Sequence, residues 1–233
     1  MTKLGMMYSG CRERVTQLVL PLDSMAAVQT AVPACPQWSV HELVAHVVGS
    51  ADDVLAGRLD GAPGQAWTAK QVAARRGRPI ADLLAGWEAR EPAIVQMIEA
   101  GGHRGPLHFR LEDAAISDAV SHEHDIRGAI GQPGARDSDA VAFGVAFYAR
   151  NRVEAAAQSG VSLRVRVTDG REFGDADATV TVTGEPFELL RALAGRRSAA
   201  QLRKLAWTGD ADLVIPAFER AGVVSPPTHS IEE

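Results

Sequence analysis

Residues 32–47 read VPACPQWSVHELVAHV and contain the clearest helix start in the chain. Ser39 and Glu42 have the spacing of a capping box, in which the N-cap side chain and the third helical residue each bond the other's backbone N–H. Apolar residues follow near the helical period, up to Leu55. The stretch predicts an amphipathic helix that begins after Ser39, carries His46 and ends before the Gly-Ala-Pro-Gly break at 61–64.

Helical periodicity extends over the first two-thirds of the chain. Besides the helix after Ser39, we expect helices at about residues 11–18, 79–100, 112–130 and 138–158. Pro92 falls inside the second of these spans and should kink or divide that helix. Together the segments predict a bundle of four or five helices.

The apolar pattern changes to a period of two after Gly160. Residues 162–167 and 178–183 alternate as half-buried strands do. We expect a third strand at 204–208, helices at 186–193 and 210–221, and a loose tail at 223–233. The sequence therefore predicts an α+β protein of two domains: a helical bundle, 1–157, and a small α+β domain, 158–233.

Composition narrows the range of functions. The 233 residues carry a net charge of −5, whereas nucleic-acid binding depends on a basic surface. No apolar run approaches the ~20 residues of a membrane span, and residues 1–5 lack a signal-peptide pattern. Two cysteines are too few for a disulfide framework. We expect a cytoplasmic protein that binds neither nucleic acid nor membrane, as a monomer or homodimer.

Three residues are candidate ligands of one divalent metal ion. Asp118 and His122 are four residues apart on one predicted helix, so their side chains lie on one face. His46, from a facing helix, can complete a site of the kind that helical bundles build. Imidazole and carboxylate suit Zn²⁺, and also Fe²⁺, Ni²⁺ or Mn²⁺. Three protein ligands leave a coordination position open, as in catalytic sites.

Each of these residues also has an interpretation without metal. A histidine on an apolar helix face is often a hydrogen-bonded core residue, and an Asp-x-x-x-His pair is often a surface hydrogen bond. Glu123 and His124 are neighbouring alternatives as ligands. Glu42 is another alternative, although its capping role explains it without metal.

Other chemically capable residues are more ambiguous. Asp125 can orient a metal-ligating histidine from behind, or pair with an arginine. Cys11 and Cys35 are interpreted as small buried apolar residues, and Trp38 as packing in the turn before the helix. Arginines can grip a substrate carboxylate, or simply be solvated. The candidates for substrate contact are Arg127, Arg196, Arg197 and Arg220.

The stretch 32–47 resembles the opening motif of the mycothiol-dependent maleylpyruvate isomerase family, within the larger DinB-like group of helical bundles. The shared pattern is a Cys-Pro-x-Trp-Ser/Thr-Val turn followed by Leu-Val-x-His. Residues 118–131, DAVSHEHDIRGAIG, resemble a second motif of that family. The resemblance implies that His46, Asp118 and His122 are the metal ligands. Many members have glutamate where this chain has Asp118.

The resemblance continues into residues 162–221, which are similar to the family's sterol-carrier-like α+β domain. It implies an enzyme that uses a divalent metal, with zinc expected, and the thiol cofactor mycothiol on a small electrophilic substrate. A thiolate that adds to a conjugated double bond and leaves again gives cis–trans isomerisation, whereas one that stays gives S-transfer. The 21 arginines against three lysines indicate a GC-rich genome, which is consistent with the actinobacterial source that mycothiol use implies.

The alternative hypothesis is a non-catalytic protein on the same scaffold that binds a metal or a small ligand. A fourth protein ligand, such as Glu42 or His124, would favour this alternative because it closes the metal site. A decayed metal site is a third possibility, but His46, Asp118 and His122 are all present.

Overall fold

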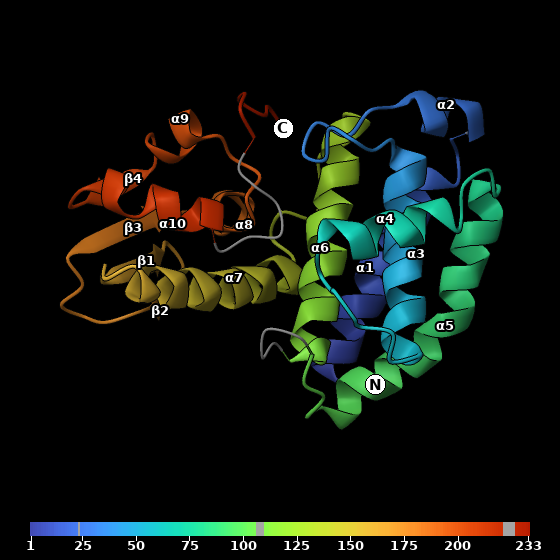
Figure 1. The fold of residues 1–233 in the computed structure, drawn as a ribbon, viewed down its shortest axis with the longest axis horizontal. Helices are drawn as coiled ribbons and strands as arrows, with labels where there is room; N and C mark the ends of the chain where they lie inside the picture. Colours follow the sequence, from blue (N-terminus) through green and yellow to red (C-terminus); the bar gives the residue numbers. More distant parts are fainter. Residues whose placement is uncertain (23, 106–109, 221–226) are drawn as a thin grey trace. The chain divides into compact units, whose positions relative to one another are not determined.

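The chain contains two compact units (Figure 1). The computed structural model describes residues 1–22, 24–105, 110–220 and 227–233. One unit comprises residues 1–134 with Glu233 and is helical, and the other comprises residues 135–232 and contains a four-stranded sheet. The predicted fold class, a helical region followed by an α+β region, is confirmed.

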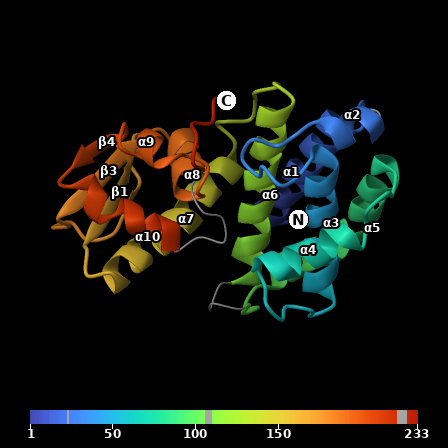
Figure 2. The same cartoon turned by 45° about the horizontal axis from the view of Figure 1, so that its top comes forward.

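Four long helices form the body of the first unit (Figure 2). They are α1 (Lys3–Val19), α3 (Val40–Leu55), α5 (Ile80–Ala100) and α6 (Leu111–Ala129), and the shorter α2 (Ser24–Gln29) and α4 (Gln65–Ala73) accompany them. Helix α1 packs against α5 and α6, while α3 packs against α4, α5 and α6. The metal-ligand candidates therefore lie on two helices, α3 and α6, that are in contact.

The start of α3 matches the capping-box prediction. The Ser39 hydroxyl accepts a hydrogen bond from the Glu42 backbone N–H at 3.3 Å, and the Glu42 carboxylate accepts one from the Ser39 N–H at 3.0 Å. The apolar face of the helix is buried from Val40 to Val48. The cap fixes where α3 begins, and this sets which face carries His46.

Helix α5 is continuous, although Pro92 lies inside it. The prediction allowed either a kink or a division at Pro92, and the helix is not divided there. The proline is exposed, whereas Trp87 and Ile94 on either side of it are buried. The buried stripe holds the two halves together despite the missing N–H. Neither α5 nor any other described helix has the length and apolar content that crossing a membrane requires.

The second unit is built around a mixed sheet. Its strands are β1 (Leu163–Val167), β2 (Glu172–Phe173), β3 (Val180–Gly184) and β4 (Ala206–Thr208), in the order β2-β1-β3-β4. Strands β1 and β3 are parallel, and the outer strands are antiparallel to them. The remaining elements are α7 (Asp139–Gln158), α8 (Pro186–Leu193), α9 (Ala199–Leu202), η2 (Ala211–Leu213) and α10 (Ile215–Arg220). Alternation along β1 buries Leu163, Val165 and Val167, as its sequence pattern predicted.

Helix α7 belongs to the second unit, so the chain divides between Gly134 and Ala135, earlier than the predicted boundary after residue 157. The helix packs against α8, α10 and β1. Arg152 on α7 donates hydrogen bonds to the carbonyls of Leu193 (2.7 Å) and Phe218 (3.2 Å). Burial lowers the pKa of Arg152 to about 10. The helical period of α7 reveals the helix but not the partner that its buried face contacts.

The end of the chain is held in place, contrary to the prediction of a loose tail. Ile231 is buried, and its backbone N–H and C=O both hydrogen-bond to the Gln201 side chain, at 3.1 and 2.9 Å. The first part of the predicted tail, residues 223–226, lies outside the described residues. A single glutamine pairing with one backbone residue is a contact that composition does not reveal.

A glycine beside the sheet provides a test of this packing. Gly174 has φ +91°, and a Cβ there would lie 2.2 Å from the Leu163 carbonyl oxygen. Gly170 has φ +95° with nothing nearby. We expect Gly170→Ala to lower the free energy of unfolding by about 1–2 kcal/mol through backbone strain alone. Gly174→Ala should cost about 2 kcal/mol more because of the added clash. Denaturant unfolding checks this, and equal effects would contradict the close approach.

Candidate metal centre

The structure brings the three predicted ligands together. Asp118 Oδ1 lies 3.3 Å from His122 Nε2 and 4.0 Å from His46 Nε2. The two imidazole rings are nearly perpendicular, at 87°, with centroids 5.1 Å apart. All three donor atoms lie within 4.8 Å of one another. Metal binding remains a prediction, but the proximity that it requires is present.

The site is buried on one side and open on the other. The side chains of His46 and His122 are 5% and 7% exposed, whereas that of Asp118 is 36% exposed. Trp38 lies with its ring centroid 5.0 Å from that of His46, and Trp67 meets the same ring edge-on at 6.4 Å. Of the three side chains, Asp118 is therefore the one that contacts solvent most.

The second nitrogen of each imidazole ring has a defined acceptor. His122 Nδ1 lies 2.9 Å from Asp125 Oδ2, and His46 Nδ1 lies 2.7 Å from Gln71 Oε1. A carboxylate or amide oxygen can only accept, so both Nδ1 atoms carry the hydrogen. In each neutral ring this leaves the Nε2 lone pair directed at the shared site. The donor set therefore fits a divalent metal such as zinc.

The electrostatics of His122 favour a cation. Burial alone would lower its pKa, but the charge of Asp118 and hydrogen bonds to Asp118 and Asp125 outweigh burial and raise the pKa well above its ordinary value. The two carboxylates that stabilise a proton on this ring would equally stabilise a metal ion beside it.

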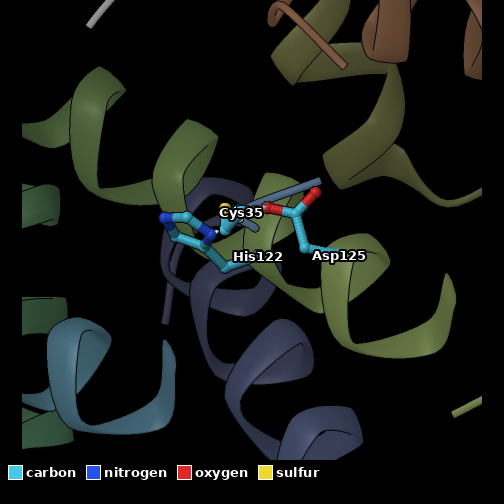
Figure 3. A group of neighbouring side chains, drawn as sticks. All are labelled: Cys35, His122 and Asp125. Atoms are coloured by element: carbon cyan, nitrogen blue, oxygen red, sulfur yellow. Dashed lines mark hydrogen bonds and ion pairs between the residues drawn. The ribbon is translucent and has the colours of Figure 1, made fainter. Parts of the chain in front are cut away.

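A second cluster lies directly behind His122 (Figure 3). Cys35 Sγ is 3.7 Å from the same Asp125 oxygen that faces His122 Nδ1. Figure 3 shows the three side chains gathered next to one another. Asp125 thus lies where the orienting interpretation placed it. Cys35 is half-buried, not buried as expected, and its thiol has a polar neighbour in Asp125.

The alternative ligands lie elsewhere or have other partners. The Glu42 carboxylate is engaged in the helix cap. Glu123 is fully buried and accepts hydrogen bonds from Arg14 and Arg127. His124 is buried and belongs to neither of the two potential metal clusters that the described residues form. No fourth protein ligand closes the site within the described part of the chain.

Three of the four candidate arginines have protein contacts in their own units. Arg127 donates to Glu123 at 3.0 Å, Arg197 forms a double hydrogen bond with Glu188, and Arg196 donates to the Ala194 carbonyl at 2.6 Å. The side chain of Arg220 lies outside the described residues. These contacts account for the burial of Arg196 and Arg197. Substrate contact by any of the four arginines stays a prediction. Cys11 is buried, as expected.

Comparison with known proteins identifies the family of the helical unit. The family model described as the mycothiol maleylpyruvate isomerase N-terminal domain matches residues 9–127, just over half of the chain and nearly all of the helical unit. No curated protein matches the sequence.

Two solved structures share the fold. The crystal structure of the mycothiol-dependent maleylpyruvate isomerase superposes with a TM-score of 0.61 at 14% identity, covering 88% of this chain and 92% of that one. A crystal structure of a histidine-to-alanine mutant of the mycothiol-dependent maleylpyruvate isomerase matches with the same TM-score and coverage at 12% identity. At this identity the likeness concerns the fold, while the sequence match of residues 9–127 shows the family: the chain belongs to the mycothiol maleylpyruvate isomerase N-terminal domain family.

Proposed function

We propose that this protein is a metal- and thiol-dependent enzyme acting on a small electrophile, as a cis–trans isomerase of the maleylpyruvate type or as an S-transferase. The observation that carries the proposal is the convergence of two Nε2 atoms and one carboxylate oxygen at a site open on the Asp118 side. The choice of mycothiol as thiol follows from the name of the family and of the solved enzyme with this fold.

His46, Asp118 and His122 would hold the metal. A divalent metal at such a site acts as a Lewis acid that lowers the pKa of a thiol and so supplies the nucleophilic thiolate at neutral pH. The protein contributes the position and orientation of the donors. Asp125 holds the ring of His122, and Trp38 and Trp67 exclude water from the ring of His46.

The exposed side of Asp118 is the entry for both thiol and substrate. The two histidine side chains are almost wholly buried, whereas that of Asp118 is 36% exposed, and this difference supports an approach past the carboxylate. A thiol and an electrophile bound next to each other at this site would react at a raised effective concentration.

The proposal is tested by assaying the purified, zinc-loaded protein with maleylpyruvate for isomerisation and with a small alkylating electrophile for S-transfer, each with and without mycothiol. We expect turnover in one assay that depends on the thiol. Turnover should fall by more than about 100-fold in Asp118→Ala, because a metal ligand is removed.

The matched control is Asp113→Ala on the same helix, where the carboxylate faces Arg110 and not the site. This variant should keep the wild-type rate. Zinc binding without turnover in either assay would reject the catalytic proposal and favour the non-catalytic binding protein. Turnover that survives Asp118→Ala would reject the proposed site.

A further inference from the structure

Helix α4 supplies a buried side chain that links His46 to a carboxylate outside the metal site. Gln71 is 2% exposed. Its Oε1 lies 2.7 Å from His46 Nδ1, and its Nε2 donates a hydrogen bond to Asp53 Oδ2 at 2.8 Å. Asp53 in turn accepts from Arg58 through its other oxygen, at 2.8 Å. A continuous chain of hydrogen bonds thus runs from Arg58 through Asp53 and Gln71 to His46.

Asp53 determines which way the Gln71 amide faces. A carboxylate has no hydrogen to donate, so it requires the NH₂ end of the amide. The opposite orientation would place the amide oxygen against the carboxylate oxygen, which is repulsive. The amide oxygen must therefore face His46, and because this oxygen only accepts, His46 Nδ1 must carry a hydrogen. Asp53 therefore determines, through Gln71, which tautomer the His46 ring adopts.

The close packing of α4 on α3 depends on a glycine one turn after His46. A Cβ built on Gly49 would lie 2.5 Å from Gln71 Cβ and 2.8 Å from Gln71 Cγ. Real side chains do not approach this closely, so a larger residue would push α4 away. Arg75, two residues after the end of α4, also forms an ion pair with Asp52 of α3. Both features keep Gln71 within hydrogen-bond distance of His46.

We propose that Gln71, oriented by Asp53, is a positioning residue that holds His46 in the Nδ1–H tautomer and so keeps Nε2 available to a metal. The consequence for metal affinity rests on the proposed function, while the tautomer itself does not. Each of the two histidines then has its own orienting acceptor: Asp125 for His122 and the Gln71–Asp53 pair for His46. Partners of this kind commonly change metal affinity by about 10–100-fold when removed.

The test uses Gln71→Met, which keeps the approximate length of the side chain and removes both the acceptor and the donor. In metal-free, ¹⁵N-labelled protein at a pH where the ring is neutral, we expect the wild-type His46 to show hydrogen on Nδ1 only. Gln71→Met should show a mixture of tautomers, and its zinc affinity, measured by competition with a chelator, should fall about 10–100-fold. Asp53→Asn should give a smaller change of the same kind, because an asparagine permits both amide orientations.

Gln65→Met is the matched control, since Gln65 is exposed at the start of the same helix. It should leave the tautomer and the zinc affinity unchanged, which excludes a general effect of methionine on α4. A wild-type tautomer in Gln71→Met would overturn the inference. If the wild type binds no zinc but Gln71→Met still changes the tautomer, the positioning role stands and the proposed function fails.

Discussion

Replacing His122 with alanine is expected to weaken zinc binding by more than about 100-fold. The substitution removes the Nε2 donor that lies 3.3 Å from Asp118, and it also removes the ring that Asp125 contacts at 2.9 Å. A chelator competition assay measures the affinity directly. Thermal unfolding gives a second readout: zinc should raise the melting temperature of the wild type by binding only the folded state, and it should not raise that of the variant.

The matched control for this variant is His103→Ala, because His103 is exposed in the loop before α6 and belongs to neither potential metal cluster of the described residues. This variant should bind zinc as the wild type does. Wild-type zinc affinity in His122→Ala would contradict the assignment of the site. A loss of zinc in His103→Ala would show that the bound ion lies elsewhere.

Replacing Glu123 with alanine should have the opposite pattern, a large loss of stability with zinc binding retained. Glu123 is fully buried, and its carboxylate lies between Arg14, with two contacts of 2.8 Å, and Arg127, with one of 3.0 Å. Without it, two guanidinium groups that are largely shielded from water would face each other. We expect the free energy of unfolding to fall by about 3 kcal/mol, measured by denaturant unfolding.

Glu13, an exposed carboxylate of the same unit, provides the control for Glu123→Ala. Glu13 is 60% exposed and lies 3.8 Å from Arg12, so Glu13→Ala should change the free energy of unfolding by less than about 0.5 kcal/mol. If Glu123→Ala instead lost zinc without losing stability, Glu123 would be a ligand and the arrangement described here would be incorrect.

The parts of the site that depend on local sequence were predictable. Ser39 and Glu42 form a cap within four residues of chain, so their pattern alone locates the start of α3. Asp118 and His122 share a face of α6 because the helical repeat places residues four apart together. The bundle pattern offered His46 as a candidate third ligand, and the family resemblance singled it out, because its contact with Asp118 spans two helices.

The parts that depend on packing between distant segments were not predictable. Helix α4 is short, and only Trp67, Gln71 and Val72 are buried in it, so its apolar pattern is too weak to separate it from a loop. The contact of Cys35 with Asp125 arises because the turn before α3 lies against α6. A polar contact of this kind leaves no periodic signal, and the same holds for Gln71 and His46.

The central claim is that His46, Asp118 and His122 together hold one metal ion. Its most direct test is elemental analysis of the purified protein, before and after reconstitution with zinc, nickel or iron, beside the His46→Ala and His122→Ala variants. The account predicts close to one ion per chain in the wild type and almost none in either variant. An absence of metal from the wild type after reconstitution, or full retention of metal in both variants, would contradict it.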